Sequence, residues 1–280
     1  MRKAVRITPA RQIAGAMRIA VGLLRQEWGS VRVKMGYLLG LTILALGIND
    51  FFRYAIKIGE PVNICEAFIV MENQGVAFRF GILGYLLVIA DAPFVRGNTY
   101  LTLYRCGRRI WNAGMLLYVF MQAFFYTLCF AGISVAASIP LGFPGGLWSS
   151  PVWLLATKTS NVVAEKYHVF FDGMSMMRHM TVLQAFGITF FYLLCYVVFL
   201  GILLYVCNLI SGGFFGLAAV AVVHSGGVFL SAAAGLHQSP AYYVDGAGGH
   251  WEYPGRMAVL ILILAAVSCH VVGRVDLQAK

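Results

Sequence analysis

Six long apolar runs constrain the fold of this chain more than any other feature of its sequence. A helix needs about 20 apolar residues to cross a bilayer, because the hydrocarbon core is about 30 Å thick and each residue rises about 1.5 Å. Hydrophobic residues make up 60% of the chain and charged residues only 11%, a composition that no soluble domain can bury. The sequence therefore predicts an all-α polytopic membrane protein with six transmembrane helices, at about 36–57, 76–92, 112–138, 183–208, 212–236 and 257–273.

The distribution of Lys and Arg predicts how these spans are oriented. An even number of spans places both termini on one side, and positive residues near span ends are retained in the cytoplasm. With the termini inside, fourteen of the 21 Lys and Arg residues lie in inner segments, and 21 minus 14 leaves seven outside. We therefore expect a multi-pass protein of the cell (plasma) membrane with both termini cytoplasmic and a short tail at 275–280. The formal charge of +10 is then explained by anionic inner-leaflet lipid and requires no nucleic-acid partner.

Two of the six predicted spans are less regular than the others. The run 76–92 contains Arg79, and an arginine at a helix centre costs about 2.5–3.5 kcal/mol on insertion scales. We expect Arg79 to lie near the outer end of its span or to face the interior of the bundle. The run 212–236 is rich in glycine, so it fits either a close-packed span or a broken, re-entrant helix pair.

Residues 1–35 precede the first span and combine a basic stripe with an apolar one. On a helix, arginines spaced every seven residues form one stripe that drifts only about 20° per heptad. A helix of this kind lies in the membrane surface with its arginines at headgroup depth. We therefore predict an N-terminal amphipathic interfacial helix, and a solvated helix on a basic tail is the alternative. The residues assigned to the interfacial helix are Arg11, Arg18, Arg25, Arg32 and Trp28.

The segment between the second and third spans is basic and is predicted to lie in the cytoplasm. Pro93 ends one helix there, and Gly107 ends another. Between them, Asn98 or Thr99 caps a short helix, at about 98–109, through a side-chain oxygen. This helix would present an aromatic and basic surface suited to a protein groove, although a basic interfacial loop fits equally well. The surface consists of Tyr100, Leu101, Tyr104 and Arg105, and the next span starts at Arg108 and Arg109.

The two predicted outer loops, at about 139–181 and 237–256, are long and rich in aromatic residues. Aromatic side chains of this kind usually anchor a protein at the membrane interface and less often surround a substrate. At the outer end of the first span, Asp50 and Arg53 are at helical spacing and are expected to form an ion pair.

The sequence contains no motif for catalysis, nucleotide binding or metal binding. It has no GxxxxGK[ST] phosphate loop, no HExxH and no CxxC, so we expect no catalytic residue, no metal site and no cofactor on this chain. No span carries an acidic residue at its centre, which argues against coupling to an ion gradient. We expect His224 to bond to a neighbouring helix, because the stretch His224-Ser225-Gly226-Gly227 has no marked base for a serine protease.

Two parts of the sequence resemble the ABC-2-type permease subunits of Gram-positive bacteria. One is Asp91-Ala-Pro-Phe followed by Tyr104-Arg105-Cys106-Gly107-Arg108-Arg109-Ile110-Trp111, a form of R-x-G-R-x-x-W. The other is Val182-Leu183-Gln184-Ala185 with Leu204-Tyr205-Val206-Cys207-Asn208-Leu209, which is similar to the fourth span of those subunits. With the basic lead-in and the six spans, the resemblance extends over nearly the whole chain.

The resemblance implies a transmembrane subunit that pairs with itself or a related permease and with two cytoplasmic ABC ATPases, which bind the ATP and Mg²⁺. It also implies that the lead-in helix lies along the membrane, that the short cytoplasmic helix docks on the ATPase, and that 212–236 is re-entrant. The long outer loop after the third span departs from the family pattern and leaves the substrate open. The residues that the resemblance assigns to the ATPase contact are Asn98, Thr99, Tyr100, Leu101, Tyr104, Arg105, Arg108 and Arg109.

These features together predict the permease subunit of an ATP-driven exporter for a hydrophobic or amphipathic substrate, such as an antimicrobial peptide, a drug or a lipid. A separate partner would hydrolyse the ATP, so the chain itself is not expected to be an enzyme. Three other functions stay open: a secondary carrier, a membrane enzyme that acts through His224 or Ser225, and a sensor or immunity subunit of an ATPase complex.

Overall fold

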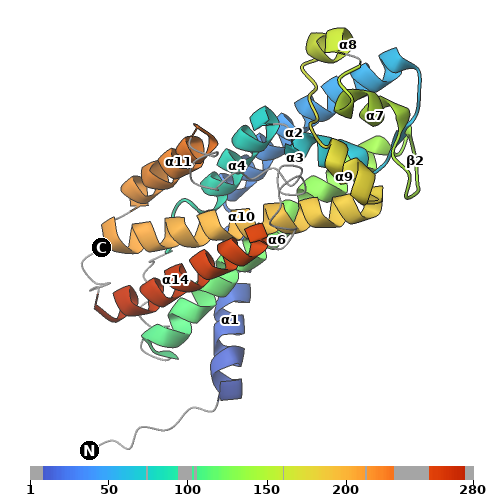
Figure 1. Cartoon of the computed structure of the whole chain (residues 1–280). Helices are drawn as coiled ribbons and strands as arrows, with labels where there is room; N and C mark the ends of the chain where they lie inside the picture. Colours follow the sequence, from blue (N-terminus) through green and yellow to red (C-terminus); the bar gives the residue numbers. More distant parts are fainter. Residues whose placement is uncertain are drawn as a thin grey trace, which may run out of the picture.

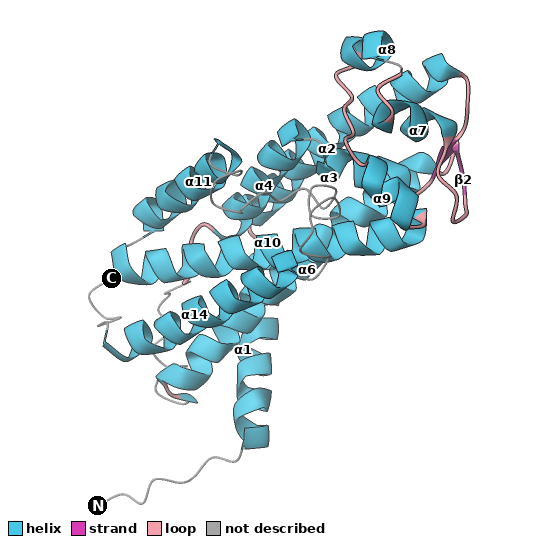
Figure 2. Ribbon diagram, viewed as in Figure 1, coloured by secondary structure: helices cyan, strands magenta, loops and turns pink. Residues whose placement is uncertain are grey.

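The computed structural model of the protein is almost entirely helical (Figures 1 and 2). It describes residues 9–73, 75–93, 103, 106–159, 161–211, 213–229 and 252–274. Within these ranges, the strands are two segments of 2 residues each. The prediction of an all-α fold is therefore confirmed.

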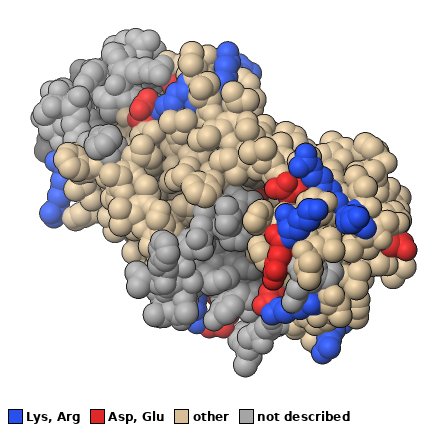
Figure 3. All heavy atoms as spheres, turned by 90° about the horizontal axis from the view of Figure 1, so that it is seen from above, with Lys and Arg blue, Asp and Glu red and all other residues tan. Residues whose placement is uncertain are grey.

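Four helices in the described part of the chain are long and apolar enough to cross a membrane. They coincide with the first, third, fourth and sixth predicted spans: α2 (Val31–Ile58), α6 (Arg108–Ser138), α10 (Val182–Ser211) and α14 (Glu252–Arg274). Figure 1 shows α6, α10 and α14 packed side by side along one direction. On the face shown in Figure 3, most of the described surface is neither blue nor red, and the charged side chains gather in separate clusters. These features are compatible with a membrane protein.

The second and fifth predicted spans contain helices that are shorter than a membrane is thick. α4 (Gly75–Ile89) has 15 residues and α11 (Gly213–Phe229) has 17, lengths of about 22 to 26 Å at about 1.5 Å per residue. α3 (Glu66–Asn73) precedes α4, so the chain is helical on both sides of residue 74. Residues 230–236 of the glycine-rich run lie outside the described residues. The arrangement with six spans therefore stays a prediction.

The lead-in forms helix α1 (Pro9–Trp28), which ends earlier than the arginine spacing predicts. The Ser30 backbone is extended, and its side-chain oxygen accepts a hydrogen bond of 3.3 Å from the Val33 N–H. Ser30 is therefore the N-cap of a new helix. The prediction that Arg32 continues the stripe of the lead-in helix is wrong, because Arg32 lies in the first turn of α2.

The faces of α1 have different surroundings. Ala16 and Ala20 are buried, and α1 approaches α6 closely at Gly114. The exposed side chains include three arginines and three large apolar residues: Arg11, Arg18, Arg25, Ile13, Met17 and Trp28. In Figure 1, α1 runs across the direction of α6, α10 and α14. A helix that crosses the long helices and exposes both kinds of side chain suits the membrane surface, and its location there stays a prediction.

Small residues bring α2 and α4 into backbone contact. A Cβ atom added at Gly84 of α4 would lie 2.6 Å from the carbonyl oxygen of Gly36 and 2.8 Å from the backbone nitrogen of Gly40. Gly36 and Gly40 have the small-xxx-small spacing that lets helix backbones approach one another in membranes. This spacing is present in the sequence, but the sequence analysis did not predict the contact.

The predicted outer loop 139–181 folds into a cap of short helices, seen at the upper right of Figure 1. A parallel pairing of β1 (Val62–Asn63) with β2 (Gly142–Phe143) joins the cap to the chain that follows α2. The Tyr54 hydroxyl of α2 donates to the carbonyl oxygen of Pro151 at 3.0 Å. The helices of the cap are α7 (Ser150–Ala156), α8 (Asn161–Lys166) and α9 (Met174–His179).

Glu66, the first residue of α3, connects the cap to the bundle. Its carboxylate is buried and accepts hydrogen bonds from the Asn63 N–H at 2.8 Å, the Ser149 N–H at 2.6 Å and the Ser149 hydroxyl at 2.5 Å. Burial raises the pKa of Glu66, and the hydrogen bonds from Ser149 and Asn63 oppose that rise only in part. A buried acid with a raised pKa makes the junction between cap and bundle sensitive to pH.

Two further predictions concern the same end of the molecule. The predicted ion pair between Asp50 and Arg53 is wrong, since the structure shows no ion pair between these two described side chains. Each is free to face solvent or headgroups instead. Of the predicted outer loop 237–256, residues 237–251 lie outside the described residues, and Glu252 begins α14.

Candidate functional site

The end of the molecule opposite the cap brings together the starts of α2 and α6 and the ends of α4, α10 and α14 (Figure 1). We call it the basic end, because α2, α6 and α14 each carry arginine there: Arg32, Arg108, Arg109 and Arg274. The predicted ATPase-contact segment, 98–109, connects α4 to α6 at this end. Six of its predicted contact residues lie outside the described residues: Asn98, Thr99, Tyr100, Leu101, Tyr104 and Arg105.

Arg32 connects α2 to the ends of α1 and α4. Its Nη1 lies 2.8 Å from Oδ2 of Asp91, and its Nη2 donates to Oε2 of Glu27 at 3.0 Å. The Glu27 side chain is 1% exposed, that of Arg32 17% and that of Asp91 69%. The inner ion pair is thus shielded from solvent and the outer one is not. Asp91, which begins the motif that resembles the permease family, is held through Arg32 to the lead-in helix.

Asn208 fixes the same turn of chain to α10. Its Nδ2 donates to the carbonyl oxygens of Ala90 and Ala92, at 2.9 and 2.6 Å, and the residue is 2% exposed. On its other side, Gly216 of α11 packs so closely that a Cβ atom there would collide with the Asn208 side chain. The asparagine therefore holds the end of α4 against α10 directly before the predicted contact segment.

The start of α6 is fixed in a similar way. Arg108 Nη1 donates to the carbonyl oxygens of Val272 and Gly273, each at 3.3 Å, at the last turn of α14. One turn further along α6, Asn112 Nδ2 donates to the Ser268 hydroxyl of α14 at 3.0 Å. Asn112 Oδ1 also accepts from the Tyr205 hydroxyl of α10 at 2.6 Å. The chain on both sides of residues 94–105 is therefore bonded to the long helices of the bundle.

The position of Arg108 and Arg109 agrees with the sequence analysis, which placed them at the start of a span. Both lie in the first turn of α6 and are exposed. Gly107 precedes them in the left-handed region, with φ +79°, a conformation that favours glycine. Trp28, assigned to the interfacial helix, is 50% exposed and contacts the rings of Tyr37 and Phe125 at 5.7 and 6.4 Å.

The two buried carboxylates of α3 were missed by the sequence analysis, which placed this segment between the spans. Glu66 connects the cap to the bundle, and Glu72 is 5% exposed. No side chain in the described part of the chain bonds to Glu72, which lies within electrostatic range of Tyr126 of α6. The sequence feature that could have indicated their burial is the apolar stretch 67–71 between them, which the structure buries completely. The argument against ion coupling from the absence of a membrane carboxylate is weaker for this reason.

His224 of α11 bonds to a neighbouring helix, as predicted. Its Nδ1 lies 2.9 Å from the Tyr196 hydroxyl of α10, and the residue is 2% exposed. The six cysteines are free thiols. Among the described residues, no group of three or more His, Cys, Asp or Glu side chains is placed to hold a metal ion.

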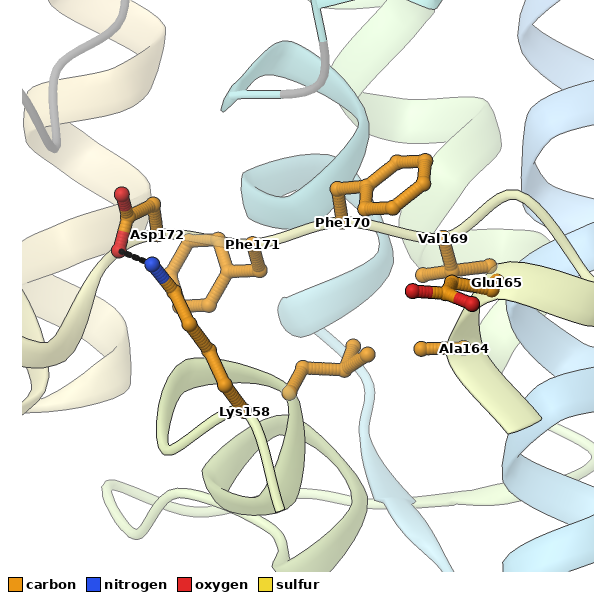
Figure 4. Close-up of a pocket in the computed structure, with 8 residues that line it drawn as sticks. Lys158, Ala164, Glu165, Val169, Phe170, Phe171 and Asp172 are labelled. Carbon is orange, nitrogen blue, oxygen red and sulfur yellow. Dashed lines mark ion pairs between the residues drawn. The ribbon is translucent and has the colours of Figure 1, made fainter. Parts of the chain in front are cut away.

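The cap contains a cavity of about 280 Å³ between α7, α8 and the chain that leads to α9. Figure 4 shows the Lys158 and Asp172 side chains paired on one side of the cavity and Glu165 on the other. The Lys158 Nζ lies 3.7 Å from Asp172 Oδ1, and both side chains are well exposed, at 66% and 84%. An exposed pair of this kind contributes little to stability, at most about 1 kcal/mol. The apolar part of the lining consists of Leu155, Ala164, Val169, Phe170 and Phe171.

No family model, no curated protein and no solved structure matches this chain. Its function is therefore argued from the geometry of the basic end and from the resemblance in sequence.

Proposed function

We propose that this chain is the transmembrane permease subunit of an ATP-driven exporter of the ABC-2 type. The observation that supports the proposal is the anchoring of the chain on both sides of residues 94–105. Before that segment, the turn after α4 is bonded to Arg32 and Asn208. After it, Arg108 is bonded to the end of α14. An ATPase docked on the segment would act on α2, α10 and α14 at once.

α10 is suited to carry such a movement across the membrane. It is a helix of 30 residues that starts beside the cap and ends at the basic end. It packs against α6, α11 and α14 along its length, and also against α3 and α4. A rigid helix held by Asn208 at one end passes a displacement of the α4 turn to the opposite side of the bundle, as in other shear motions of packed helices.

The proposed orientation places the basic end in the cytoplasm. The arginines of α1 and those at the starts of α2 and α6 then meet the anionic inner leaflet, as the distribution of Lys and Arg predicts. α1 would lie on the inner membrane surface with Ile13, Met17 and Trp28 in the interface. The cap of short helices would face the outside.

A second permease and a hydrophobic or amphipathic substrate complete the proposal. Large apolar side chains remain exposed on two of the long helices, where they suit contact with lipid or with a second permease. These side chains are Leu38, Leu39 and Leu46 of α2 and Val259, Leu262 and Ile263 of α14. In this arrangement ATP and Mg²⁺ bind only to the partner subunit.

The experiment is a pull-down of the chain in mild detergent from its native host, with mass spectrometry of the bound proteins. We expect an ABC ATPase among them, and we expect its recovery to fall at least tenfold when Tyr104→Ala and Arg105→Asp are combined. The matched control is Trp153→Ala with Lys158→Asp, an exposed aromatic and basic pair in the cap. Recovery of no ATPase with the wild-type chain would refute the proposal.

A second candidate function, an ion-coupled carrier, is favoured by the buried Glu72. A carboxylate with no partner among the described residues, close to the core of the bundle, is a typical group for binding a proton or a sodium ion. The test is the decay of a proton gradient in liposomes that contain only this purified chain. Faster decay than in empty liposomes, lost on Glu72→Gln and kept on Glu60→Gln, would favour the carrier. Decay at the rate of empty liposomes would argue against proton transport by this chain alone.

A further inference from the structure

We propose that the cavity between the start of α6 and the end of α14 binds the phosphate of an anionic phospholipid headgroup. The cavity has a volume of about 390 Å³, and its lining includes Arg108, Arg109, His270 and Arg274. The inference requires only that α6 and α14 cross a membrane, and it is independent of an ATPase partner.

The charge of the cavity is the first argument. Its eight lining residues include three arginines and a histidine, and none is acidic. Arg108 is held in place by the carbonyl oxygens of Val272 and Gly273. Arg109 and Arg274 are exposed and form no ion pair with any described side chain. Guanidinium groups bind phosphate through two parallel hydrogen bonds, so a cavity lined by three arginines and by no acidic residue among the described ones suits a phosphate ester.

The position of the cavity is the second argument. It lies where one long apolar helix begins and another ends, which is the depth of the lipid headgroups for helices that span the bilayer. Basic pockets between transmembrane helices at this depth bind anionic headgroups.

The side chains along α14 distinguish a lipid from a free phosphate. Ile263, Val267, His270 and Arg274 follow one another at spacings of four, three and four residues, so they lie on one face of the helix. Ile263 and Val267 are 53% and 37% exposed, and His270 and Arg274 line the cavity. The face thus changes from apolar to basic toward the end of the helix. An acyl chain lies along the apolar part when the phosphate occupies the cavity, whereas a free phosphate makes no use of it.

The experiment measures lipid binding to the purified full chain in detergent, by native mass spectrometry and by the shift of its unfolding temperature. The probes are dioleoyl phosphatidylglycerol and, as the neutral lipid, dioleoyl phosphatidylcholine. We expect stabilisation by phosphatidylglycerol alone. Changing Arg109→Gln and Arg274→Gln together should weaken phosphatidylglycerol binding about 30-fold, because each basic residue near the membrane surface contributes about 1 kcal/mol.

Two comparison variants separate this effect from a loss of fold or of overall charge. Arg109→Lys with Arg274→Lys keeps the charge and should retain most of the binding. Arg53→Gln with Lys57→Gln removes the same charge from the opposite end of α2 and should bind phosphatidylglycerol as the wild type does. Equal weakening in the Arg53→Gln and Lys57→Gln control would overturn the proposal, since it would show a general charge effect.

The source of the phosphate is tested with inorganic phosphate and with Val267→Gln. We expect inorganic phosphate to stabilise the chain far less than phosphatidylglycerol at the same concentration. We also expect Val267→Gln to weaken the binding of phosphatidylglycerol without changing any response to inorganic phosphate. Equal stabilisation by inorganic phosphate, or unchanged lipid binding by Val267→Gln, would contradict a lipid site and would indicate a free anion instead.

Discussion

The Arg32 guanidinium of α2 lies 2.8 Å from the carboxylate of Asp91, at the turn where α4 ends. The same guanidinium bonds to Glu27, which is 1% exposed, whereas Asp91 is 69% exposed. Removal of Arg32 therefore takes an ion pair away from a buried carboxylate, whereas removal of the Asp91 charge affects only an exposed pair. We expect Arg32→Gln to lower the free energy of unfolding in detergent by about 3 kcal/mol, and Asp91→Asn by less than about 1 kcal/mol. Equal losses in the two variants would contradict this description of the junction.

Asn208 supplies two hydrogen bonds to the backbone of the α4 turn, and its replacement should destabilise the protein. We expect Asn208→Leu to lower the free energy of unfolding by about 1–3 kcal/mol, because the carbonyl oxygens of Ala90 and Ala92 lose their amide donor. Asn208→Asp preserves the shape of the side chain but removes the donor, so it should destabilise at least as much. Thermal unfolding in one detergent measures both, and a stable Asn208→Asp variant would show that the bonds contribute nothing.

Gly84 should not tolerate even a methyl group. A Cβ atom there would lie within 3.0 Å of backbone atoms of both Gly36 and Gly40, and backbone atoms cannot rotate away. We expect Gly84→Ala to cost about 1–3 kcal/mol. Gly132 of α6 is the control, because a Cβ atom at that position meets no other atom within 4 Å. Gly132→Ala should be neutral or stabilise by up to about 1 kcal/mol, and similar effects at the two glycines would argue against the α2–α4 contact.

The raised pKa of Glu66 predicts a pH dependence of stability. The folded protein holds the proton of the Glu66 carboxyl more tightly than the unfolded chain does. The stabilisation that comes from this proton is therefore fully present below the ordinary pKa of 4.5, and it is lost as the pH rises through the pKa of Glu66 in the folded protein. The variant Glu66→Gln has no proton to lose at this position. We therefore expect the free energy of unfolding of the wild type, relative to that of Glu66→Gln, to fall as the pH rises from about 4.5. Parallel pH profiles for the two proteins would contradict the burial of a titrating carboxyl.

The long helices could be predicted from the sequence because each has a simple physical cause. The runs 36–57, 112–138 and 183–208 are apolar over at least the length of a membrane span, and 257–273 is a shorter apolar run. Each of the four lies inside one helix of the structure. The boundary near residue 30 was missed. Arginine spacing suggests one continuous helix there, whereas the Ser30 side chain caps a new one. The local capping bond between Ser30 and Val33 outweighs the periodicity of the arginines.

The candidate site could be predicted only in part. The position of Arg108 and Arg109 at the start of α6 follows from local charge, since arginines mark the ends of apolar runs. The pairing of Arg32 with Asp91 and of Asn208 with Ala92 joins positions far apart in the chain, and no local pattern carries that information. The burial of Glu72 was missed because a glutamate followed by an asparagine is typical of a loop. The apolar residues 67–71 that precede it are nevertheless all buried.

The proposal that an ATPase docks between α4 and α6 is tested most directly by photo-crosslinking in intact cells of the native host. Benzoylphenylalanine is placed at position 104 and, as the control, in place of Ile56, an exposed residue at the opposite end of α2. The proposal predicts an adduct between position 104 and an ATP-binding polypeptide, and no such adduct from position 56. A chain that is inserted in the membrane and yields no ATPase adduct from position 104, or yields it equally from position 56, would contradict the proposal.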